Sequence, residues 1–232
     1  MSTRLLLALC CCIAPLRGEG VVVKTEILAV ALDAPVEGLF IDTGNGIQPF
    51  SANLTGLGMP MTYQGPRHLV LHKSEAAFKP VPGQQPPTPA GVVELPAVSD
   101  RAILVCTHNP DGALKMVAYD ISTGGMKPGD YRFFNYSKLP VSFIVGEKKF
   151  SLFPGTDNLV SDSKWQTGVM DLEVQFGLRP SADQPFKRVY ASVWGHRPIR
   201  RNYVFLFDGI SASKPITSRR FFDILPAITT AR

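Results

Sequence analysis

Apolar residues recur at every second position in many short segments of this chain, and this alternation constrains its fold more than any other feature. Between Met170 and Phe176, every even-numbered residue is apolar and every odd-numbered residue is polar. Because successive side chains of a β-strand point to opposite faces, this pattern predicts a strand with one face in a core and the other in solvent. The 20 glycines and 20 prolines argue against long helices, inside which they cost about 1 and 3 kcal/mol each. The sequence therefore predicts an all-β protein.

Other segments with strand character lie between turn residues. A hairpin is expected where Val141–Val145 is followed by the turn Gly146-Glu147-Lys148 and the return strand 150–152. The remaining strand candidates are residues 26–32, 38–41, 68–72, 103–106, 115–120, 131–135, 189–194 and 203–208. Short helical turns are expected only at 74–78 and 219–225, and the second of these equally fits a closing strand. Many short strands predict a two-sheet antiparallel β-sandwich of immunoglobulin-like or Greek-key type, with few or no helices.

A proline-rich segment interrupts this pattern. Residues 79–91 read KPVPGQQPPTPAG, a composition that favours an extended polyproline conformation and offers few N–H groups to a sheet. We expect one continuous sandwich over residues 21–228. The alternative is two sub-domains, 21–78 and 92–228, joined by this segment. No repeat of fixed period is visible in the sequence.

The first 20 residues have the features of a secretory signal peptide. Arg4 gives a positive start, residues 5–14 are apolar, and Gly18 and Gly20 place small residues before Val21. The apolar stretch is too short for a membrane-spanning helix, which needs about 20 such residues. We therefore expect residues 1–20 to be removed on export. The product would be periplasmic or extracellular, without a transmembrane segment.

The cysteines bear on both anchoring and stability. Cys10, Cys11 and Cys12 lie where a lipoprotein would carry its lipid, so peripheral or lipid-anchored association is the alternative to simple cleavage near Gly20. Leu9, however, stands before Cys10 where a lipobox has a small residue. Removal of the leader would leave only Cys106, and no intramolecular disulfide could then form even in an oxidising compartment.

Charge gives little indication of a partner. The formal net charge is +5, and basic residues gather late in the chain, at Arg197, Arg200, Arg201, Lys214, Arg219 and Arg220. We interpret these residues as a solvated face. The alternative is attraction to an anionic polymer or envelope surface. No basic run is dense enough to predict nucleic-acid binding.

One stretch of the second half combines several recognisable features. Residues 127–155 (KPGDYRFFNYSKLPVSFIVGEKKFSLFPG) contain a turn, a strand that ends in Asn135, a hairpin and a Pro-Gly exit. This combination resembles uncharacterised secreted bacterial β-sandwich proteins. Residues 63–66 (YQGP) with 69–71 (LVL), and residues 201–205 (RNYVF), are similar to earlier and later strands of that family. The family brings no established activity, so the resemblance implies only fold and export.

Four residues suggest a copper site. Blue-copper centres use two histidines, a cysteine and often a weak methionine ligand, and His68, Cys106, His108 and Met116 follow that order. The resemblance to cupredoxins is incomplete, because only one residue separates the cysteine from the histidine where those proteins usually have two or more. His68 and His72 cannot share a metal on a strand, where they would lie about 13 Å apart. A copper-binding electron carrier is therefore an alternative, and we expect no metal or cofactor.

Asp42-Thr43-Gly44 resembles the active-site signature of aspartic proteases. Those enzymes need two such aspartates that share a proton. The chain has no second Asp-Thr-Gly or Asp-Ser-Gly, so only a homodimer could complete the site. Asn45-Gly46 in the same segment is a strong hairpin signal. We expect a hairpin loop here, with a dimeric protease acting through Asp42 as a second alternative.

No other catalytic signature stands out. The sequence has neither a Gly-x-Ser-x-Gly nucleophile motif nor a phosphate-binding glycine loop. Trp165, Trp194, Tyr190 and Tyr203 would suit a sugar-stacking platform, but core packing is the simpler interpretation. We therefore expect a non-enzymatic envelope or periplasmic protein that acts in binding or assembly. Its partner would be a protein or glycan rather than a nucleic acid, and its exposed strands offer edges to which a partner strand can add.

Overall fold

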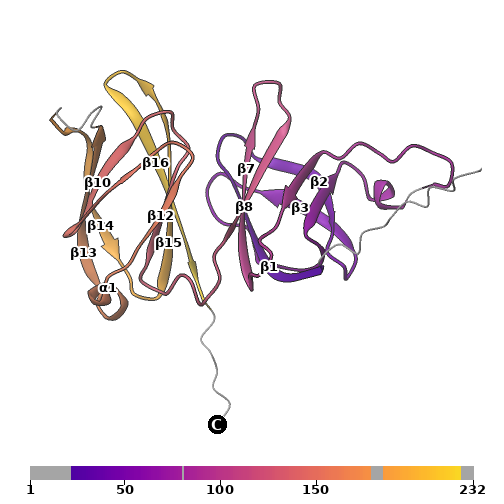
Figure 1. Ribbon diagram of the computed structural model, residues 1–232, viewed down its shortest axis with the longest axis horizontal. Coiled ribbons are helices and arrows are strands. Elements are labelled where there is room, and N and C mark those ends of the chain that lie inside the picture. The colour runs from indigo at the N-terminus through magenta and orange to yellow at the C-terminus, as the bar shows by residue number, and fades with distance from the viewer. Residues whose placement is uncertain (1–21, 80, 179–184, 226–232) are drawn as a thin grey trace, which may run out of the picture.

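The structure is a computed structural model that describes residues 22–79, 81–178 and 185–225 (Figure 1). These residues are mainly β-strand, which confirms the predicted all-β class. The first half contains β1 (Val22–Ala31), β2 (Val36–Asp42), β3 (Ile47–Ala52), β4 (Met61–Pro66), β5 (His68–His72), the 3-10 turn η1 (Glu75–Phe78), β6 (Gly91–Glu94), β7 (Arg101–His108) and β8 (Leu114–Asp120). The expected signal peptide, residues 1–20, lies outside the described residues.

The second half contains a similar set of elements. They are β9 (Tyr131–Asn135), β10 (Val141–Val145), β11 (Lys148–Leu152), β12 (Asp157–Val160), the short helix α1 (Ser163–Thr167), β13 (Met170–Leu178), β14 (Lys187–His196), β15 (Arg200–Ser211) and β16 (Lys214–Ile224). Among the described residues, no helix is long and apolar enough to cross a membrane.

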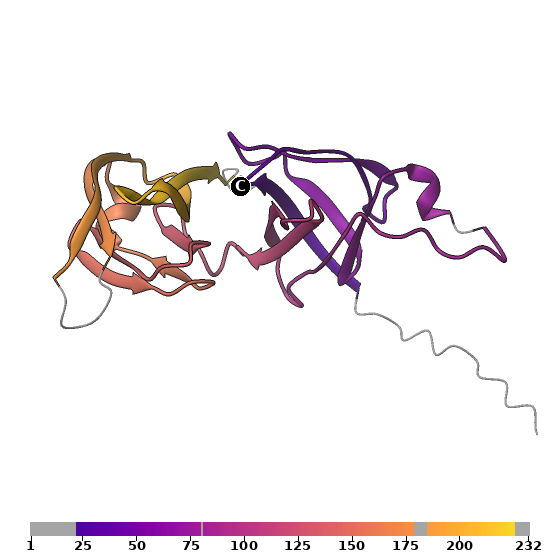
Figure 2. The ribbon, with the colours of Figure 1, turned by 90° about the horizontal axis from the view of Figure 1, so that it is seen from above.

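The strands form four sheets of four strands, where the sequence predicted two sheets. We call them sheet A (β4-β1-β7-β8), sheet B (β3-β2-β5-β6), sheet C (β12-β9-β15-β16) and sheet D (β11-β10-β13-β14). Sheets A and B make an N-terminal lobe, sheets C and D make a C-terminal lobe, and the lobes lie side by side (Figures 1 and 2). Most pairings are antiparallel, as predicted, but β1 pairs with β7 and β9 with β15 in parallel.

The two lobes have the same topology. In sheet A, β1 pairs antiparallel with β4 and parallel with β7, and β7 forms a hairpin with β8. In sheet C, β9, β12, β15 and β16 repeat these pairings. Sheets B and D also share one order, in which β10, β11, β13 and β14 take the places of β2, β3, β5 and β6. Every strand of the N-terminal lobe thus has a counterpart eight strands later, a repeat that the sequence did not reveal.

Equivalent sheets of the repeat meet at the centre of the molecule. Apolar residues from sheets A and C pack together, and sheets B and D lie outermost (Figure 1). The lobes are thus not related by a simple translation, which would bring unlike sheets into contact. Because like sheets meet, the contact between the lobes resembles the contact between like surfaces in an isologous dimer.

Three apolar clusters fill the spaces between the four sheets. The first lies between A and B, the second between C and D, and the third between A and C. Sheets A and C are consequently covered on both faces. This explains why residues 27–32, 102–106 and 203–206 are apolar in continuous runs and buried throughout, since alternation is required only where one face of a strand meets solvent.

The proline-rich segment lies within the N-terminal lobe. It connects β5 to β6, and these strands pair with each other, with His68 opposite Glu94 and Leu71 opposite Gly91. The segment is therefore a long connection within sheet B. The chain passes from one lobe to the other at residues 121–130, so the lobes do not coincide with the sub-domains 21–78 and 92–228. Proline content indicates that a segment leaves a sheet, but not which sheet the chain enters next.

Both predicted hairpins are confirmed. β10 and β11 pair around Gly146-Glu147, with Val145 opposite Lys148, and β2 and β3 pair with Asp42 opposite Ile47. Residues 219–225, which fitted either a helical turn or a strand, fall largely in β16. The strands that the pattern did not identify include β3, β6 and β12, which have six residues or fewer and show too little alternation to be recognised.

Candidate functional site

The four residues considered for copper do not converge. His68 begins β5 in sheet B, whereas Cys106 and His108 lie on β7 in sheet A. Met116 is directly opposite Cys106 on β8, and the structure brings only this pair of β-strand neighbours together. Within residues 22–79, 81–178 and 185–225, no three His, Cys, Asp or Glu side chains are grouped closely enough to hold a metal ion.

The surroundings of Cys106 and His108 indicate a structural role for both residues. Cys106 is buried in the cluster between sheets A and B. Burial, and to a smaller extent the charge of Asp33, raises the pKa of its thiol to about 12, which disfavours the thiolate that a metal requires. His108 Nδ1 lies 3.1 Å from Asp33 Oδ1, and the His108 backbone N–H donates to Asp33 Oδ2 at 2.6 Å. This pair joins the end of β7 to the turn after β1.

Asp42 stands in the hairpin between β2 and β3. Its Oδ1 accepts from the backbone N–H of Gly44 at 2.9 Å, and the hydroxyl of Thr43 donates to the carbonyl of Gly46 at 3.0 Å. Gly44 has φ +81°, and a Cβ at this position would clash with the carbonyl of Gln64 in β4. Only glycine therefore fits where the backbone of β4 passes close to the loop. The Asp-Thr-Gly residues thus serve the local geometry of a hairpin.

The aromatic residues considered for sugar stacking are mostly part of the core. Trp165 and Trp194 are buried in the cluster between sheets C and D, and Trp194 Nε1 donates to the half-buried Tyr190 hydroxyl at 2.9 Å. Tyr203 is buried at the junction of the lobes. The sequence did not identify His196, which is fully buried and has its Nε2 2.6 Å from the carbonyl of Trp165.

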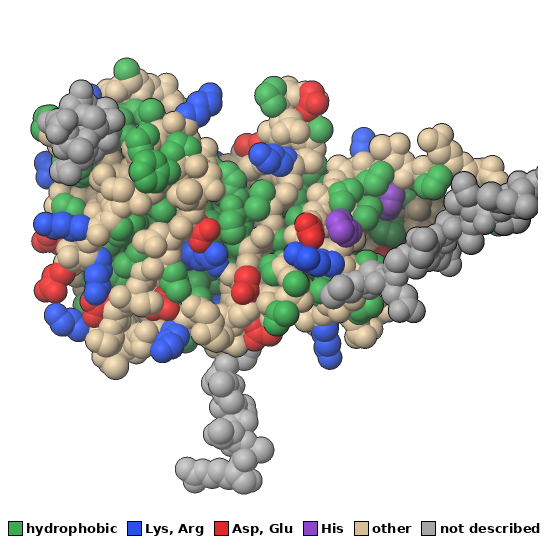
Figure 3. Space-filling view, in the orientation of Figure 1, with side chains coloured by type: hydrophobic (Ala, Val, Ile, Leu, Met, Phe, Trp, Pro, Cys, Tyr) green, Lys and Arg blue, Asp and Glu red, His purple; other side chains and the backbone are tan. Residues whose placement is uncertain are grey.

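The late basic residues do not share one solvated face, and that interpretation was wrong. Arg201 is fully buried, and Arg219 donates to the carbonyl of Leu32 in the other lobe at 2.8 Å. Arg220 places its guanidinium carbon 4.7 Å from the centre of the Trp194 ring. On the face seen in Figure 3, Lys and Arg side chains are interspersed with Asp and Glu.

A buried ion network joins the lobes, and sequence reasoning missed it. Asp223 of β16 accepts from Arg201 Nη2 at 2.7 Å and from Arg201 Nε at 3.1 Å. Arg101 of the N-terminal lobe places Nη2 3.2 Å from the same carboxylate and Nη1 3.1 Å from Glu26. Burial and the charge of Asp223 raise the pKa of Tyr203, so its hydroxyl stays protonated and donates to Asp223 at 3.2 Å. This network thus links residues of the two lobes.

β14 is a long edge strand of the described structure. Among the described residues, β14 ends sheet D and pairs with β13 on one side only. Soluble proteins usually protect such edges with proline, charge or short length. Accordingly, β3 contains a proline, β11 begins with two lysines, and β6 and β12 have four residues each. β14 has ten residues, and its segment 189–196 (VYASVWGH) contains neither proline nor a Lys, Arg, Asp or Glu.

The structural repeat supplies a comparison for this edge. β6, the counterpart of β14, packs against β8, so closely that a Cβ at Gly91 would meet the side chains of Met116 and Leu114. β14 makes few contacts with β16, the counterpart of β8. Ser192 lies opposite the buried Val174 and therefore faces the lobe interior, yet it is exposed. The C-terminal lobe is thus open along a side that the N-terminal lobe closes.

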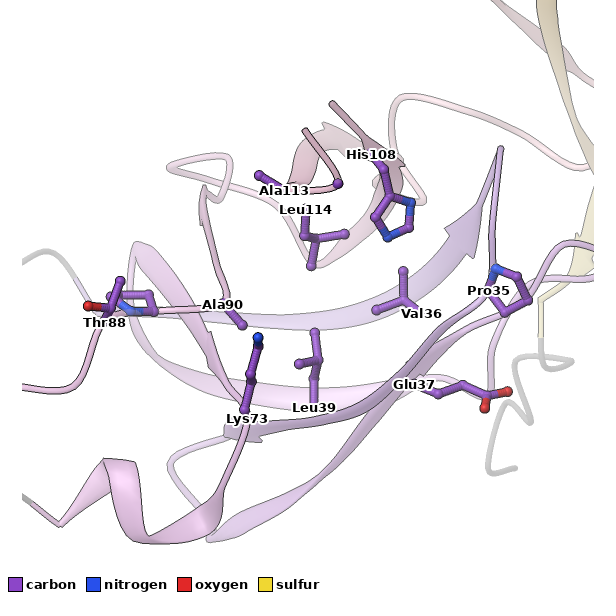
Figure 4. Close-up of a pocket in the computed structure, with 12 residues that line it drawn as sticks. Pro35, Val36, Glu37, Leu39, Lys73, Thr88, Ala90, His108, Ala113 and Leu114 are labelled. Carbon is purple, nitrogen blue, oxygen red and sulfur yellow. The ribbon is translucent and has the colours of Figure 1, made fainter. Parts of the chain in front are cut away.

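A cleft lies between sheets A and B of the N-terminal lobe (Figure 4). Its volume of about 430 Å³ falls in the range of about 300–1,000 Å³ that ligand pockets occupy. Val36 and Leu39 of β2 line one side, Leu114 of β8 lines the other, and Thr88 to Ala90 of the proline-rich segment border it. His108 is the only residue of the sequence-predicted copper set that lines this cleft.

The Asp33–His108 pair yields a pH-dependent prediction. Partial burial opposes ionisation of Asp33, but hydrogen bonds from His108 and Ala34 outweigh it and lower the pKa of Asp33 below its ordinary 3.8. A carboxylate with a lowered folded-state pKa stabilises the protein above its unfolded pKa, and this contribution is lost as the pH falls through the folded value. We therefore expect Asp33→Asn to be less stable than the wild type at pH 7 in urea unfolding.

The difference between Asp33→Asn and the wild type should shrink as the pH is lowered below about 5, because the unfolded-state carboxylate then takes up a proton more readily than the folded-state carboxylate does. A difference that stays constant down to the acid unfolding of the wild type would contradict the assignment.

Comparison of the sequence with protein-family models and with curated proteins gave no match.

Proposed function

We propose that this protein is an exported, non-enzymatic binding or assembly protein of the cell envelope, and that it captures an extended segment of a protein partner on the unpaired edge of β14. The observation that carries the proposal is the eight-residue segment 189–196 of this edge, which contains neither proline nor a Lys, Arg, Asp or Glu side chain. A partner strand added there would extend sheet D. Main-chain hydrogen bonds would supply affinity, and alternate side chains would supply specificity. The leader-like character of residues 1–20 supports export.

The charges around β14 favour an acidic partner. Lys187 and Arg188 begin the strand, Arg220 lies against the Trp194 ring, and β14 contains no Asp or Glu. If two copies of β14 paired antiparallel, Lys187 of one copy would lie near Arg197 of the other, and like charges opposite each other destabilise a sheet. The partner we infer is therefore an extended segment with alternating apolar residues and with carboxylates near its ends.

A synthetic peptide, Glu-Glu-Val-Thr-Val-Thr-Glu-Glu, tests this proposal by calorimetric titration. We expect it to bind at least about tenfold more tightly than the same peptide with lysine in place of glutamate, a difference of about 1.4 kcal/mol. Its affinity should fall as salt is added, because the charges involved are exposed. Equal affinity for the two peptides would overturn the choice of an acidic partner.

Two matched proline variants test the mode of binding. N–H groups of successive residues in a strand point to opposite edges, so one of Ala191 and Ser192 donates toward β13 and the other points outward. Ala191→Pro and Ser192→Pro should therefore differ: one lowers stability, and the other folds normally but loses peptide binding by about tenfold or more. If neither variant folds, two peptides that are N-methylated at alternate residues give the same information. Methylation of the N–H groups that point toward β14 should prevent strand addition, whereas methylation of the N–H groups that point away from β14 should not. Equal binding in all these cases would contradict strand addition.

A further inference from the structure

The cleft of the N-terminal lobe has apolar walls. Val36 and Leu39 are buried residues of β2, and Leu114 faces them across the opening. Pro89 and Ala90 add apolar surface at the border. The walls are parts of both sheets and of the proline-rich segment, so the cleft is formed by residues that are distant in the sequence. Such a surface would bind an apolar group through the hydrophobic effect.

The polar residues that line the cleft differ in charge and in the direction of their side chains. Lys73 extends into the opening from the side of sheet B, and His108 extends into it from the side of sheet A (Figure 4). Glu37 is the acidic residue of the lining, and its carboxylate is directed away from the opening (Figure 4). Asp33 pairs with His108, whereas Lys73 forms no ion pair with any residue that the structure describes. Within the part of the chain that the structure describes, Lys73 is therefore an unpaired positive charge that faces the apolar walls, whereas the unpaired carboxylate of Glu37 points away from them.

We propose that this cleft binds a small apolar carboxylic acid, with its aliphatic part against Val36, Leu39 and Leu114 and its carboxylate at Lys73. A single ammonium without a carboxylate partner among the described residues matches a monoanion. Planar bidentate recognition of a phosphate or of two anionic groups typically uses arginine, and no arginine lines the cleft. The opening also suits a ligand of limited size, because its volume is about 430 Å³. This site is separate from the β14 edge and does not depend on the proposed function.

Decanoate and decanol are suitable probes, because they share the same chain and differ in charge. In calorimetric titrations below the micelle concentration, the wild type should bind decanoate at least about tenfold more tightly than decanol. Lys73→Ala should bring decanoate to the level of decanol without changing the affinity for decanol. Unchanged preference for decanoate in Lys73→Ala would overturn the assignment of the carboxylate to this lysine.

A pair of tryptophan variants tests the place of binding. Ala113 is exposed at the rim of the cleft, so Ala113→Trp should fill the opening and abolish binding of both probes. Ala212→Trp is the matched control, since Ala212 is exposed in the turn between β15 and β16 of the other lobe, and it should bind as the wild type does. Binding that survives in Ala113→Trp, or that is lost equally in both variants, would overturn the site. Decanoate binding should persist in the β14 proline variant that folds normally, so failure of the strand-addition proposal would leave this result intact.

Discussion

Asp223→Ala is expected to lower the free energy of unfolding by about 3–5 kcal/mol, the usual cost of removing one partner from a buried ion pair. Asp223 is the carboxylate that faces both Arg101 and Arg201. Without it, Arg101 would keep Glu26, but the fully buried Arg201 would keep only the carbonyl of Ile121, at 2.7 Å. The expected loss arises mainly from this uncompensated guanidinium, because a buried charge has no water to solvate it.

Urea unfolding followed by circular dichroism measures this effect. Glu147→Ala is a suitable control, since Glu147 and Lys164 form an exposed pair with atoms 3.8 Å apart, and exposed pairs contribute little to stability. We expect the midpoint of Asp223→Ala to shift strongly and that of Glu147→Ala to stay near the wild type. Similar midpoints for the two variants would show that the network does not stabilise the junction of the lobes.

Phe205→Ala is expected to destabilise the protein by a similar amount, about 3–5 kcal/mol, because it leaves a cavity in a packed interior. Phe205 is fully buried between sheets A and C. Its ring stacks on Phe134, with centroids 4.7 Å apart and an angle of 9°, and lies 5.8 Å from the Phe221 ring. Phe153→Ala is the matched control, because Phe153 is 66% exposed and should change stability by no more than about 0.5 kcal/mol.

The number of unfolding transitions is as informative as the midpoint of unfolding. The apolar cluster between sheets A and C and the ion network both join the lobes, so we expect the wild type and Phe205→Ala to unfold in one cooperative transition. A large apolar interface between domains normally couples them in this way. Two transitions in Phe205→Ala, with the second at the wild-type midpoint, would show that the lobes unfold independently.

Local patterns predicted the parts of the fold that depend on near neighbours. Val141, Phe143 and Val145 alternate, are buried in the structure, and are followed by the predicted turn at Gly146. The patterns were less informative for residues 102–106 and 203–206, where both faces of each strand are covered. A continuous apolar run indicates burial but not the sheets that supply it.

The buried network shows the same limit for polar residues. Arg201 stands in phase with Tyr203 and Phe205 on one face of β15, and this phase was a signal that the side chain lies in the interior. The sequence could not identify its partners, because Asp223 comes from the neighbouring strand and Arg101 from the other lobe. For the copper hypothesis the sequence misled in the opposite direction. The order of His68, Cys106, His108 and Met116 along the chain suggested one site, but His68 lies in a different sheet from the other three residues.

The amino-acid sequence by itself determined the all-β class, the two hairpins, and a single cysteine beyond residues 1–20. These properties follow from side-chain periodicity and turn chemistry, which act over a few residues. Only the tertiary structure decided that four sheets stack as two equivalent lobes and that Lys73 and His108 border one cleft. It also decided that β6 packs against β8, whereas β14 has no second strand beside it in the part of the chain that the structure describes. Those features depend on which strands meet across long stretches of chain, and pairing at that distance is governed by packing of whole faces rather than by any local pattern.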